Sequence, residues 1–286
     1  MKNPLVSVII VNFNGAKFLD SCLSSLKEQT YPNFEVIVVD NGSTDSSLKI
    51  LEEGYRGFVT VIKNEINFGF SKGNNIGISQ ANGEFVAILN NDTQADARWL
   101  EELISAAQTD KNTGMCATKV LFFCERDTID SAGVNIFWDG MSRGRGRLKK
   151  DIGQYDGDRE VLLPSGCAAL YRKSMLQETG LFDEDFVAYC EDTDLGLRGR
   201  LAGYKCAFAP LAVVYHHYSG TAGRYSSFKA FMVERNHFWV ALKIFPAPLL
   251  LLLPFFTVYR LAMQVLSLFG YLSKKGNNKE ERFPIL

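Results

Sequence analysis

Three short polar segments carry side chains that could hold a phosphorylated ligand and a cation. Asn12–Gly15, Asp40–Asp45 and Asn90–Thr93 are rich in Asn and Asp, and each directly follows an apolar run. The Asp40 carboxylate can accept hydrogen bonds from a ligand, and Asp92 offers the oxygen ligand that suits a hard cation bound to phosphate. Taken by itself, each segment also fits an ordinary turn or helix cap, which for Asp40 is the simpler interpretation.

Two later segments add acids and histidines. Glu191–Asp194 holds three acidic residues at the predicted start of a helix, and His216-His217 closes an apolar run. Acids at a helix N-terminus are favoured by the helix dipole, so part of this cluster needs no function. Three neighbouring acids nevertheless repel each other, and one of them could serve as a general base. A histidine of the pair could be a ligand or a phosphate contact, or equally an ordinary surface residue.

One motif suggests a different chemistry. Gly69–Gly73 matches G-x-S-x-G, the nucleophile elbow of α/β hydrolases, with Ser71 as the nucleophile. The elbow requires a buried strand directly before it, whereas the polar stretch Asn64–Phe68 precedes it here. The hydrolase is therefore only a third hypothesis, and the phosphate-loop and dinucleotide-binding fingerprints are absent from the sequence.

Composition excludes several classes of protein. The 286 residues are 47% hydrophobic with a formal net charge of −1, which argues against disorder and against nucleic-acid binding. The six cysteines form no C-x-x-C pair and the chain has three histidines, so structural zinc is not expected. A metal would rely on carboxylates, which favours Mg²⁺ or Mn²⁺. Unpatterned cysteines in a chain of this size indicate a reducing compartment.

The spacing of apolar residues predicts the elements that position these side chains. Apolar runs alternate with helical periodicity over the first 120 residues, as in an α/β protein whose open, mostly parallel sheet has helices on both faces. Ligands bind beyond the carboxyl ends of such strands, where the three polar segments fall. Ser43 or Thr44 is the predicted cap of the second helix. The expected strands are Leu5–Val11, Phe34–Val39, Phe58–Ile62, Phe85–Leu89 and Met115–Val120, and the expected helices surround 18–26, 48–51, Lys72–Ala81 and Ala97–Gln108.

The regular spacing of apolar residues is lost after residue 121 and returns after residue 160. Residues 122–160 are rich in Gly, Asp and Arg and are predicted to be an irregular excursion. Five cations fall within residues 143–150, which could contact a phosphate-bearing acceptor or anionic headgroups, or form a solvated loop. The predicted later elements are strands at Val161–Leu163, Ala168–Tyr171, Cys206–Ala209 and Ala212–Tyr215, and a helix at Thr193–Leu201.

The C-terminal segment differs in kind. Residues 244–259 and 261–273 carry no charge, but three prolines and Arg260 interrupt them. We expect an apolar helical tail that associates with a membrane surface through residues 244–273; packing on the domain or another subunit, and a spanning pair, are the alternatives. We therefore divide the chain into residues 1–240 and 241–286. The apolar run after Lys2 is too short for a signal peptide, so the first part is expected in the cytoplasm.

The order of these motifs along the chain resembles a family 2 glycosyltransferase of the GT-A fold. The matching stretches are Val6–Gly15, Val38–Asp45, Asn67–Gly77, Leu89–Asp92, Gly166-Cys167, Glu191–Leu195 and His216-His217-Tyr218-Ser219. Together they span residues 4–240, with the excursion unmatched. The pattern is most similar to the rhamnosyltransferase-like branch that builds bacterial surface polysaccharides.

The resemblance implies roles for matching residues. Asp40 would contact the pyrimidine base of a nucleotide-sugar, and Asp192 would be the catalytic base with Glu191 as the second candidate. Asn90 replaces the first acid of the family's D-x-D motif, so Mg²⁺ or Mn²⁺ would rest on Asp92, assisted by His216. The expected nucleotide-sugar contacts are Asn12, Asn14, Asp40, Asn41, Asn67, Gly69, Lys72, Asn90 and Asn91.

We therefore expect a metal-dependent, inverting glycosyltransferase. It would move a sugar, with rhamnose one candidate, from a UDP- or dTDP-sugar to a glycan or polyprenyl-linked acceptor. Its expected location is the cytoplasmic face of the bacterial inner membrane. The alternative is a non-catalytic nucleotide-sugar-binding or scaffold protein of the same fold, which the loss of an acid at Asn90 keeps open.

Overall fold

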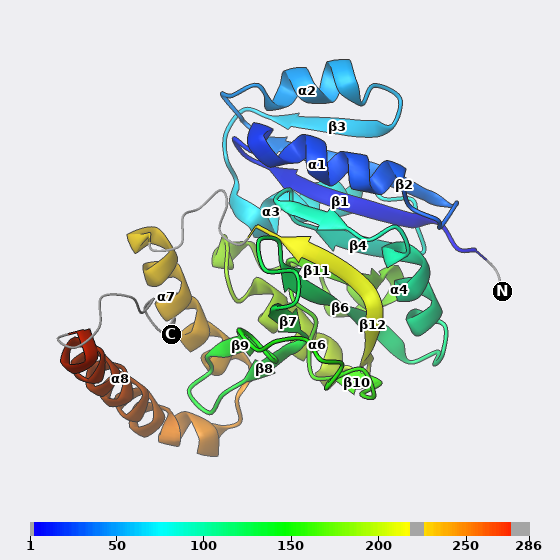
Figure 1. The fold of residues 1–286 in the computed structure, drawn as a ribbon. Coiled ribbons are helices and arrows are strands. Elements are labelled where there is room, and N and C mark those ends of the chain that lie inside the picture. Colours follow the sequence, from blue (N-terminus) through cyan, green and yellow to red (C-terminus); the bar gives the residue numbers. More distant parts are fainter. Residues whose placement is uncertain (1–2, 218–225, 276–286) are drawn as a thin grey trace.

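A computed structural model of the chain describes residues 3–217 and 226–275 and has a central mixed sheet with helices on both faces (Figure 1). Its strand order is β10-β12-β6-β11-β4-β1-β2-β3, with β5 paired to β12 and β7 to β6. The strands are β1 Val6–Asn12, β2 Phe34–Asn41, β3 Val59–Asn64, β4 Phe85–Leu89, β5 Thr93–Ala95, β6 Thr113–Phe122, β7 Ile129–Ala132, β8 Val134–Ile136, β9 Ser142–Gly144, β10 Glu160–Val161, β11 Ala168–Arg172 and β12 Lys205–His216. The helices are α1 Ala16–Lys27, α2 Ser47–Gly54, α3 Gly69–Ser79, α4 Trp99–Ala107, α5 Lys173–Thr179, the 3₁₀ turn η1 Glu184–Phe186, α6 Glu191–Leu201, α7 Ser227–Ile244 and α8 Ala247–Lys275.

The N-terminal half has the parallel arrangement that its apolar runs predict. Strands β1, β2, β3 and β4 are parallel, with Asn12 opposite Asp40 at the carboxyl ends of β1 and β2. Alternate residues of each strand face different helices: Val8 packs in a cluster with Leu23 of α1, whereas Ile9 packs in a cluster with Ile78 of α3. Burial on both faces explains why these strands are continuously apolar.

The C-terminal half is less regular. Strand β11 lies antiparallel between β4 and β6, while β12 is again parallel to β6. The two strands expected at 206–209 and 212–215 are one strand, β12, with a shift of register between Ala209 and Val213. The extra residues at this bulge interrupt the apolar alternation, which explains the wrong prediction of two strands.

Two further expectations need correction. The cap of α2 is Ser46, and Ser43 instead accepts hydrogen bonds from Asn12 and the backbone of Asn14. The segment 122–160 contains β7 and the β8–β9 hairpin, and buried Lys119 of β6 pairs with Asp151 and Asp156 of this segment. Ion pairs with the sheet and the buried Ile129 and Ala132 of β7 anchor this region without a regular apolar periodicity. A pattern search for apolar residues therefore does not detect its order.

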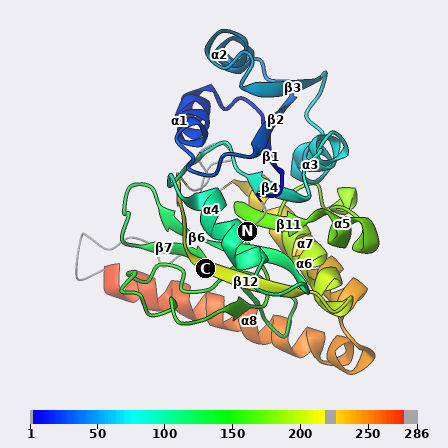
Figure 2. The same cartoon turned by 90° about the vertical axis from the view of Figure 1, so that its right-hand side faces the viewer.

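The last two helices lie together at one end of the molecule, beside the β8–β9 hairpin (Figures 1 and 2). Helix α7 continues across the expected boundary at residue 240 and ends at Ile244. Helix α8 contains Pro254, and Arg260 joins it to the body through Asp139 and Glu234. Among the described residues, no helix is both long enough and apolar enough to cross a membrane. Tyr218-Ser219 and residues 276–286 of the expected tail lie outside the described residues.

Candidate functional site

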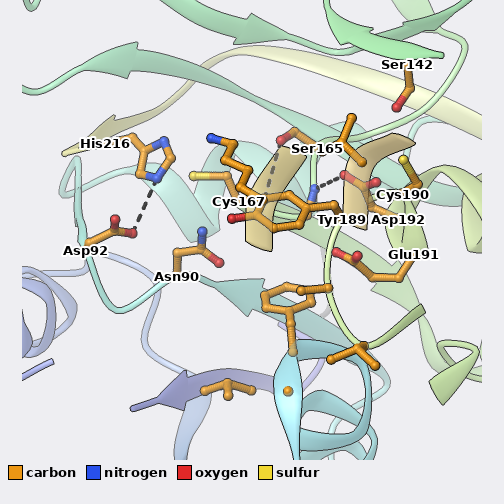
Figure 3. Close-up of a pocket in the computed structure, with 18 of the residues that line it drawn as sticks. Asn90, Asp92, Ser142, Ser165, Cys167, Tyr189, Cys190, Glu191, Asp192 and His216 are labelled. Atoms are coloured by element: carbon orange, nitrogen blue, oxygen red, sulfur yellow. Dashed lines mark hydrogen bonds and ion pairs between the residues drawn. The ribbon is translucent and has the colours of Figure 1, made fainter. Parts of the chain in front are cut away.

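A cavity of about 860 Å³ opens at the carboxyl ends of the parallel strands (Figure 3). Residues from β1, β2, β7, β9, β12, α6 and α7 line it, so both halves of the sheet contribute. In Figure 3, Asp92 and His216 lie at one side and Glu191 and Asp192 at the other, with Tyr189 drawn between them. Of the residues expected at the site, Asn41, Asn67, Gly69, Asn90, Asn91, Asp92, Glu191, Asp192 and His216 line the cavity.

Behind this cavity, a network of hydrogen bonds connects side chains at the carboxyl ends of strands β1 and β2. The Asn12 amide donates to Asp40 Oδ2 (2.9 Å) and accepts from Asn91 Nδ2 (2.8 Å). The other Asp40 oxygen accepts from the Ser43 backbone N–H (2.9 Å), and Asn14 Oδ1 accepts from the Thr44 N–H. Asn12 and Asp40 are almost completely buried, so they support the wall of the cavity instead of lining it. We call Asn12, Asn14, Asp40, Ser43 and Asn91 the donor edge.

Gly69, at the start of α3 beside the donor edge, lies close to the loop before α6. Asn41 donates to Asn67 Oδ1 (3.4 Å) and to the Gly69 carbonyl, and Asn67 accepts from the Gly69 N–H. At Gly69, where φ is +82°, a Cβ atom would lie 2.7–2.8 Å from atoms of Val187. A side chain at position 69 would clash and would strain the backbone, so this position requires glycine. Lys72 pairs with Glu184 at 3.7 Å and lies outside the lining of the cavity.

His216 lies between two buried carboxylates. Its Nε2 is 3.3 Å from Asp92 Oδ1, and its Nδ1 is 2.7 Å from Asp130 Oδ2. Asp130 also accepts a hydrogen bond from Arg147. Burial alone would lower the pKa of His216, but electrostatic interactions and hydrogen bonds with Cys167 and Asp92 raise it to about 10. His216 Nε2 and Asp92 Oδ1 are thus suited to hold either a proton or a cation between them.

The residues at this position fit a divalent cation that is shared with phosphate. Asp92 and His216 supply one carboxylate and one imidazole facing the cavity, and Asn90 lies beside them (Figure 3). In the described ranges, no group of three or more His, Cys, Asp or Glu side chains is arranged to hold a metal by itself. Mg²⁺ and Mn²⁺ sites commonly take their remaining ligands from water and from substrate phosphates. The ligands present therefore fit a cation that takes its remaining ligands from water or phosphate oxygens.

The loop before α6 has a strained backbone. Val187, Tyr189 and Cys190 all have positive φ values, between 62° and 70°, which cost roughly 1–3 kcal/mol each for residues with side chains. The buried amide of Asn236 in α7 donates to the carbonyls of Phe186, Ala188 and Tyr189, at 2.6–2.9 Å. We call Phe186–Asp192 the acid turn. A side chain from a helix that follows it in sequence holds it in shape.

The two acids of this turn differ in their partners. Asp192 accepts from the Gly166 N–H (2.7 Å) and from the Thr193 N–H (2.7 Å), whereas Glu191 Oε2 is buried with no hydrogen-bond partner in the described structure. Burial raises the pKa of Asp192, although these N–H groups oppose the shift. Burial and then the charge of Asp192 raise the pKa of Glu191 well above its usual value. Asp192 is therefore the better carboxylate, and Glu191 the better holder of a proton.

The third acid of the cluster and the serine motif have structural explanations. Asp194 is fully buried and pairs with Arg198 and with Lys243 of α7. Ser71 is fully buried in the first turn of α3. Because a substrate cannot reach a buried hydroxyl, the hydrolase hypothesis is wrong.

Sequence reasoning missed Asp130 and Asn236. Asp130 lies in the excursion, and its contact with His216 spans 86 residues. Asn236 lies on a helix after the last recognised motif. Of the basic residues between 143 and 150, Arg145, Arg147 and Lys150 pair with Asp158, Asp130 and Asp127, while exposed Arg143 lines the cavity. Charges of this kind have no sequence periodicity, so only the tertiary structure assigns their partners.

Comparison with known proteins gives agreeing results. A family model described as glycosyl transferase family 2 matches residues 7–180. An uncharacterized protein of Sinorhizobium fredii is 32% identical over 235 residues, which cover 77% of this chain and 25% of that protein. The O-antigen biosynthesis protein RfbC of Myxococcus xanthus is 30% identical over 227 residues, covering 76% of this chain and 18% of that protein. This chain thus matches a quarter or less of the length of these two curated relatives.

The fold is also similar to a solved structure. The crystal structure of GalNAc-T7 with UDP, GalNAc and Mn²⁺ matches with a TM-score of 0.67 at 19% sequence identity. The match covers 83% of this chain and 47% of that one. At this identity the likeness concerns the fold.

Proposed function

This chain belongs to glycosyl transferase family 2 and has the GT-A fold, and on that premise we propose that it is an inverting glycosyltransferase. The donor is a pyrimidine nucleotide-sugar, a UDP- or dTDP-sugar, with rhamnose one candidate sugar. The acceptor is a glycan or a polyprenyl-linked glycan of a cell-surface polysaccharide, a role that fits the O-antigen relative. One observation carries the proposal: a single cavity is bordered by both the Asp92–His216 pair and the Asp192 carboxylate.

The donor edge supports nucleotide binding. Asp40 and Asn12 fix the ends of β1 and β2, which holds the adjoining Asn41 and, through it, Asn67 in the lining of the cavity. Asp92 and His216 lie where they would hold Mg²⁺ or Mn²⁺, which when bound would neutralise the charge of the departing nucleoside diphosphate. GalNAc-T7, which shares the fold, binds UDP and Mn²⁺.

Asp192 performs the proton transfer in this proposal. The Gly166 and Thr193 N–H groups orient the carboxylate, and burial raises its pKa toward the range of an effective general base. Asp192 takes the proton of an acceptor hydroxyl while that oxygen attacks the anomeric carbon from the face opposite the diphosphate. The new glycosidic bond forms as the sugar–phosphate bond breaks. The electron pair of the broken bond leaves with the diphosphate. One displacement inverts the anomeric centre.

Donor turnover tests this proposal against a non-catalytic binding protein. The protein is incubated with UDP- and dTDP-sugars, with Mn²⁺ or with EDTA, and the release of nucleoside diphosphate is measured. We expect release with Mn²⁺ only, and an NMR spectrum of the product with the anomeric configuration opposite to that of the donor. Stabilisation by the donor without release would favour the binding protein, and retained configuration would exclude single displacement.

We further propose that α8 rests on the cytoplasmic face of the bacterial inner membrane. Leu251, Phe255, Val258 and Leu266 are exposed and recur on one side of α8, whereas Arg260 faces the body through Asp139 and Glu234. Burial of such a stripe in the headgroup region is favourable. All six cysteines are free thiols, which fits a reducing compartment.

Vesicle flotation tests the role of α8. Replacing Leu251, Phe255 and Val258 by Ser should abolish co-flotation with anionic vesicles and leave donor turnover in solution intact. The matched control replaces the exposed Ile66, Leu201 and Leu211, which lie on other elements. Equal flotation of both variants would exclude this surface, and a dimer that dissociates only in the α8 variant would assign it to a second copy of the chain.

A further inference from the structure

Asp130 is a buried acid that the proposed mechanism does not use, and the residue is 5% exposed. Asp130 belongs to β7, in the excursion that the family motifs do not cover. Its Oδ2 lies 2.7 Å from His216 Nδ1, and its Oδ1 accepts from the Arg147 guanidinium. The result is a continuous row of contacts from Arg147 through Asp130 and His216 to Asp92.

The geometry argues that Asp130 acts on His216 and not directly on a cation. The two nitrogens of an imidazole ring point in different directions, so a cation at Nε2 beside Asp92 is out of reach of a carboxylate on Nδ1. The described residues contain no cluster of three ligating side chains that includes Asp130. Its negative charge at the cavity wall is instead offset by Arg147. Asp130 is therefore placed to orient the ring.

We propose that Asp130 is the positioning residue of the cation site. The inference rests on the proposed cation dependence and deepens it. The Asp130 carboxylate accepts the Nδ1–H of His216 and holds the ring so that Nε2 faces Asp92. Arg147 in turn fixes the second oxygen of Asp130. A carboxylate behind a metal-bound histidine fixes ring orientation and increases the basicity of the ligand.

In this proposal, residues 122–160 and part of their basic cluster help to position the ligand His216. Arg147 is one of the five cations between residues 143 and 150, yet it faces inward to Asp130, with only 13% of its side chain exposed. Lys150 of the same cluster pairs with the exposed Asp127 at the surface. Changes in this excursion would therefore tune the affinity for the cation without any change in the ligands themselves.

Titration with Mn²⁺ in the presence of UDP tests the inference without measuring activity. Free Mn²⁺ is followed by electron paramagnetic resonance with the wild type, Asp130→Asn and the matched control Asp127→Asn. Loss of a carboxylate behind the ligand should weaken Mn²⁺ binding by about 10–100-fold in Asp130→Asn, and the control should match the wild type. Equal affinity of a folded Asp130→Asn would overturn the positioning role while leaving the proposed cation site intact. No Mn²⁺ binding by the wild type would overturn both.

A measurement on the wild type covers the case in which Asp130→Asn does not fold. The chain contains only three histidines, so ¹⁵N labelling of their rings gives few signals, and His217→Gln and His237→Gln assign them. With UDP and Cd²⁺ as a diamagnetic probe, the Nε2 signal of His216 should shift while Nδ1 keeps its proton. A shift at Nδ1, or at neither nitrogen, would overturn the inference.

Discussion

The donor edge and the acid turn border the same cavity but are built in opposite ways. At the donor edge, Asn12, Asp40 and Asn91 satisfy each other's hydrogen bonds at the ends of regular strands. In the acid turn, the backbone is left-handed at Val187, Tyr189 and Cys190, and Glu191 Oε2 has no partner in the described structure. Strain and unpaired buried polar atoms concentrate where a protein needs reactivity. This difference supports the proposed division, with recognition at the donor edge and proton transfer at the acid turn.

The largest effect should come from the acid turn itself. Asp192→Asn keeps the size of the side chain but removes its ability to take a proton. Because general-base catalysis contributes about 10²–10⁴-fold, the turnover number should fall by that factor while UDP binding, measured by calorimetry, persists. Glu191→Gln should reduce turnover less, because Glu191 is the better holder of a proton. If Glu191→Gln has the larger loss, the two assignments must be exchanged.

The next effect tests what holds the acid turn. Asn236→Ala removes an amide donor from the carbonyls of Phe186, Ala188 and Tyr189. Displacing a reacting group by about 1 Å can cost 10²-fold in rate, so turnover should fall by about 10–100-fold. Urea unfolding should show a loss of about 1–3 kcal/mol for the removed hydrogen bonds.

Asn75→Ala is the matched control for this variant. Asn75 also donates to a backbone carbonyl, that of Phe182 at 2.8 Å, but it lies outside the lining of the cavity. It should lower stability with little change in the turnover of the folded protein. Similar turnover losses in both variants would show that Asn236 acts through stability alone.

A smaller effect is expected at the donor edge. Asp40→Ala removes a charge-assisted partner of Asn12 and of the Ser43 N–H. Such hydrogen bonds are worth about 1.5–3 kcal/mol of folding stability. Because the ends of β1 and β2 lose this support, the dissociation constant for UDP should rise, with the rate at saturating donor nearly unchanged. Calorimetry and steady-state kinetics measure the two quantities. Unchanged UDP affinity in a folded variant would remove Asp40 from donor recognition.

The same contrast explains what could be predicted from the sequence. Leu5–Val11 and Phe85–Leu89 are continuous apolar runs, so burial on both faces is visible in composition, and both form strands of the sheet. Of the polar residues directly after them, Asn90–Asp92 line the cavity and Asn12 supports its wall, because the carboxyl ends of parallel strands share one edge. Local pattern therefore predicted the parallel strands and the position of Asp92 at their carboxyl ends, whereas for Glu191 it predicted only the start of a helix.

The missed features depend on partners far away in the chain. Asp130 becomes a partner of His216 only once β6, β7 and β12 are assembled. Asn236 resembles any polar residue on a helix until the acid turn presents its carbonyls. Asp194 belongs to the same cluster as Asp192, but its role is set by Arg198 and by Lys243 of α7. Sequence spacing cannot separate the two acids, because they lie on one helical turn and only their partners differ.

The smallest effect is a dependence of stability on pH at Glu191. Its pKa is raised in the folded protein, by burial and by the charge of Asp192. Between the unfolded and folded pKa values the native state holds more protons than the unfolded chain, so stability declines as the pH rises through this interval. Gln resembles the protonated side chain at every pH. Glu191→Gln should therefore melt at the wild-type temperature at pH 4 and above it at pH 8, by about 2–4 °C for each kcal/mol released. Differential scanning calorimetry at both pH values measures the difference in melting temperature between the variant and the wild type. An equal difference at pH 4 and pH 8 would mean that Glu191 carries no desolvation penalty. The contrast with the donor edge would then rest on backbone strain alone.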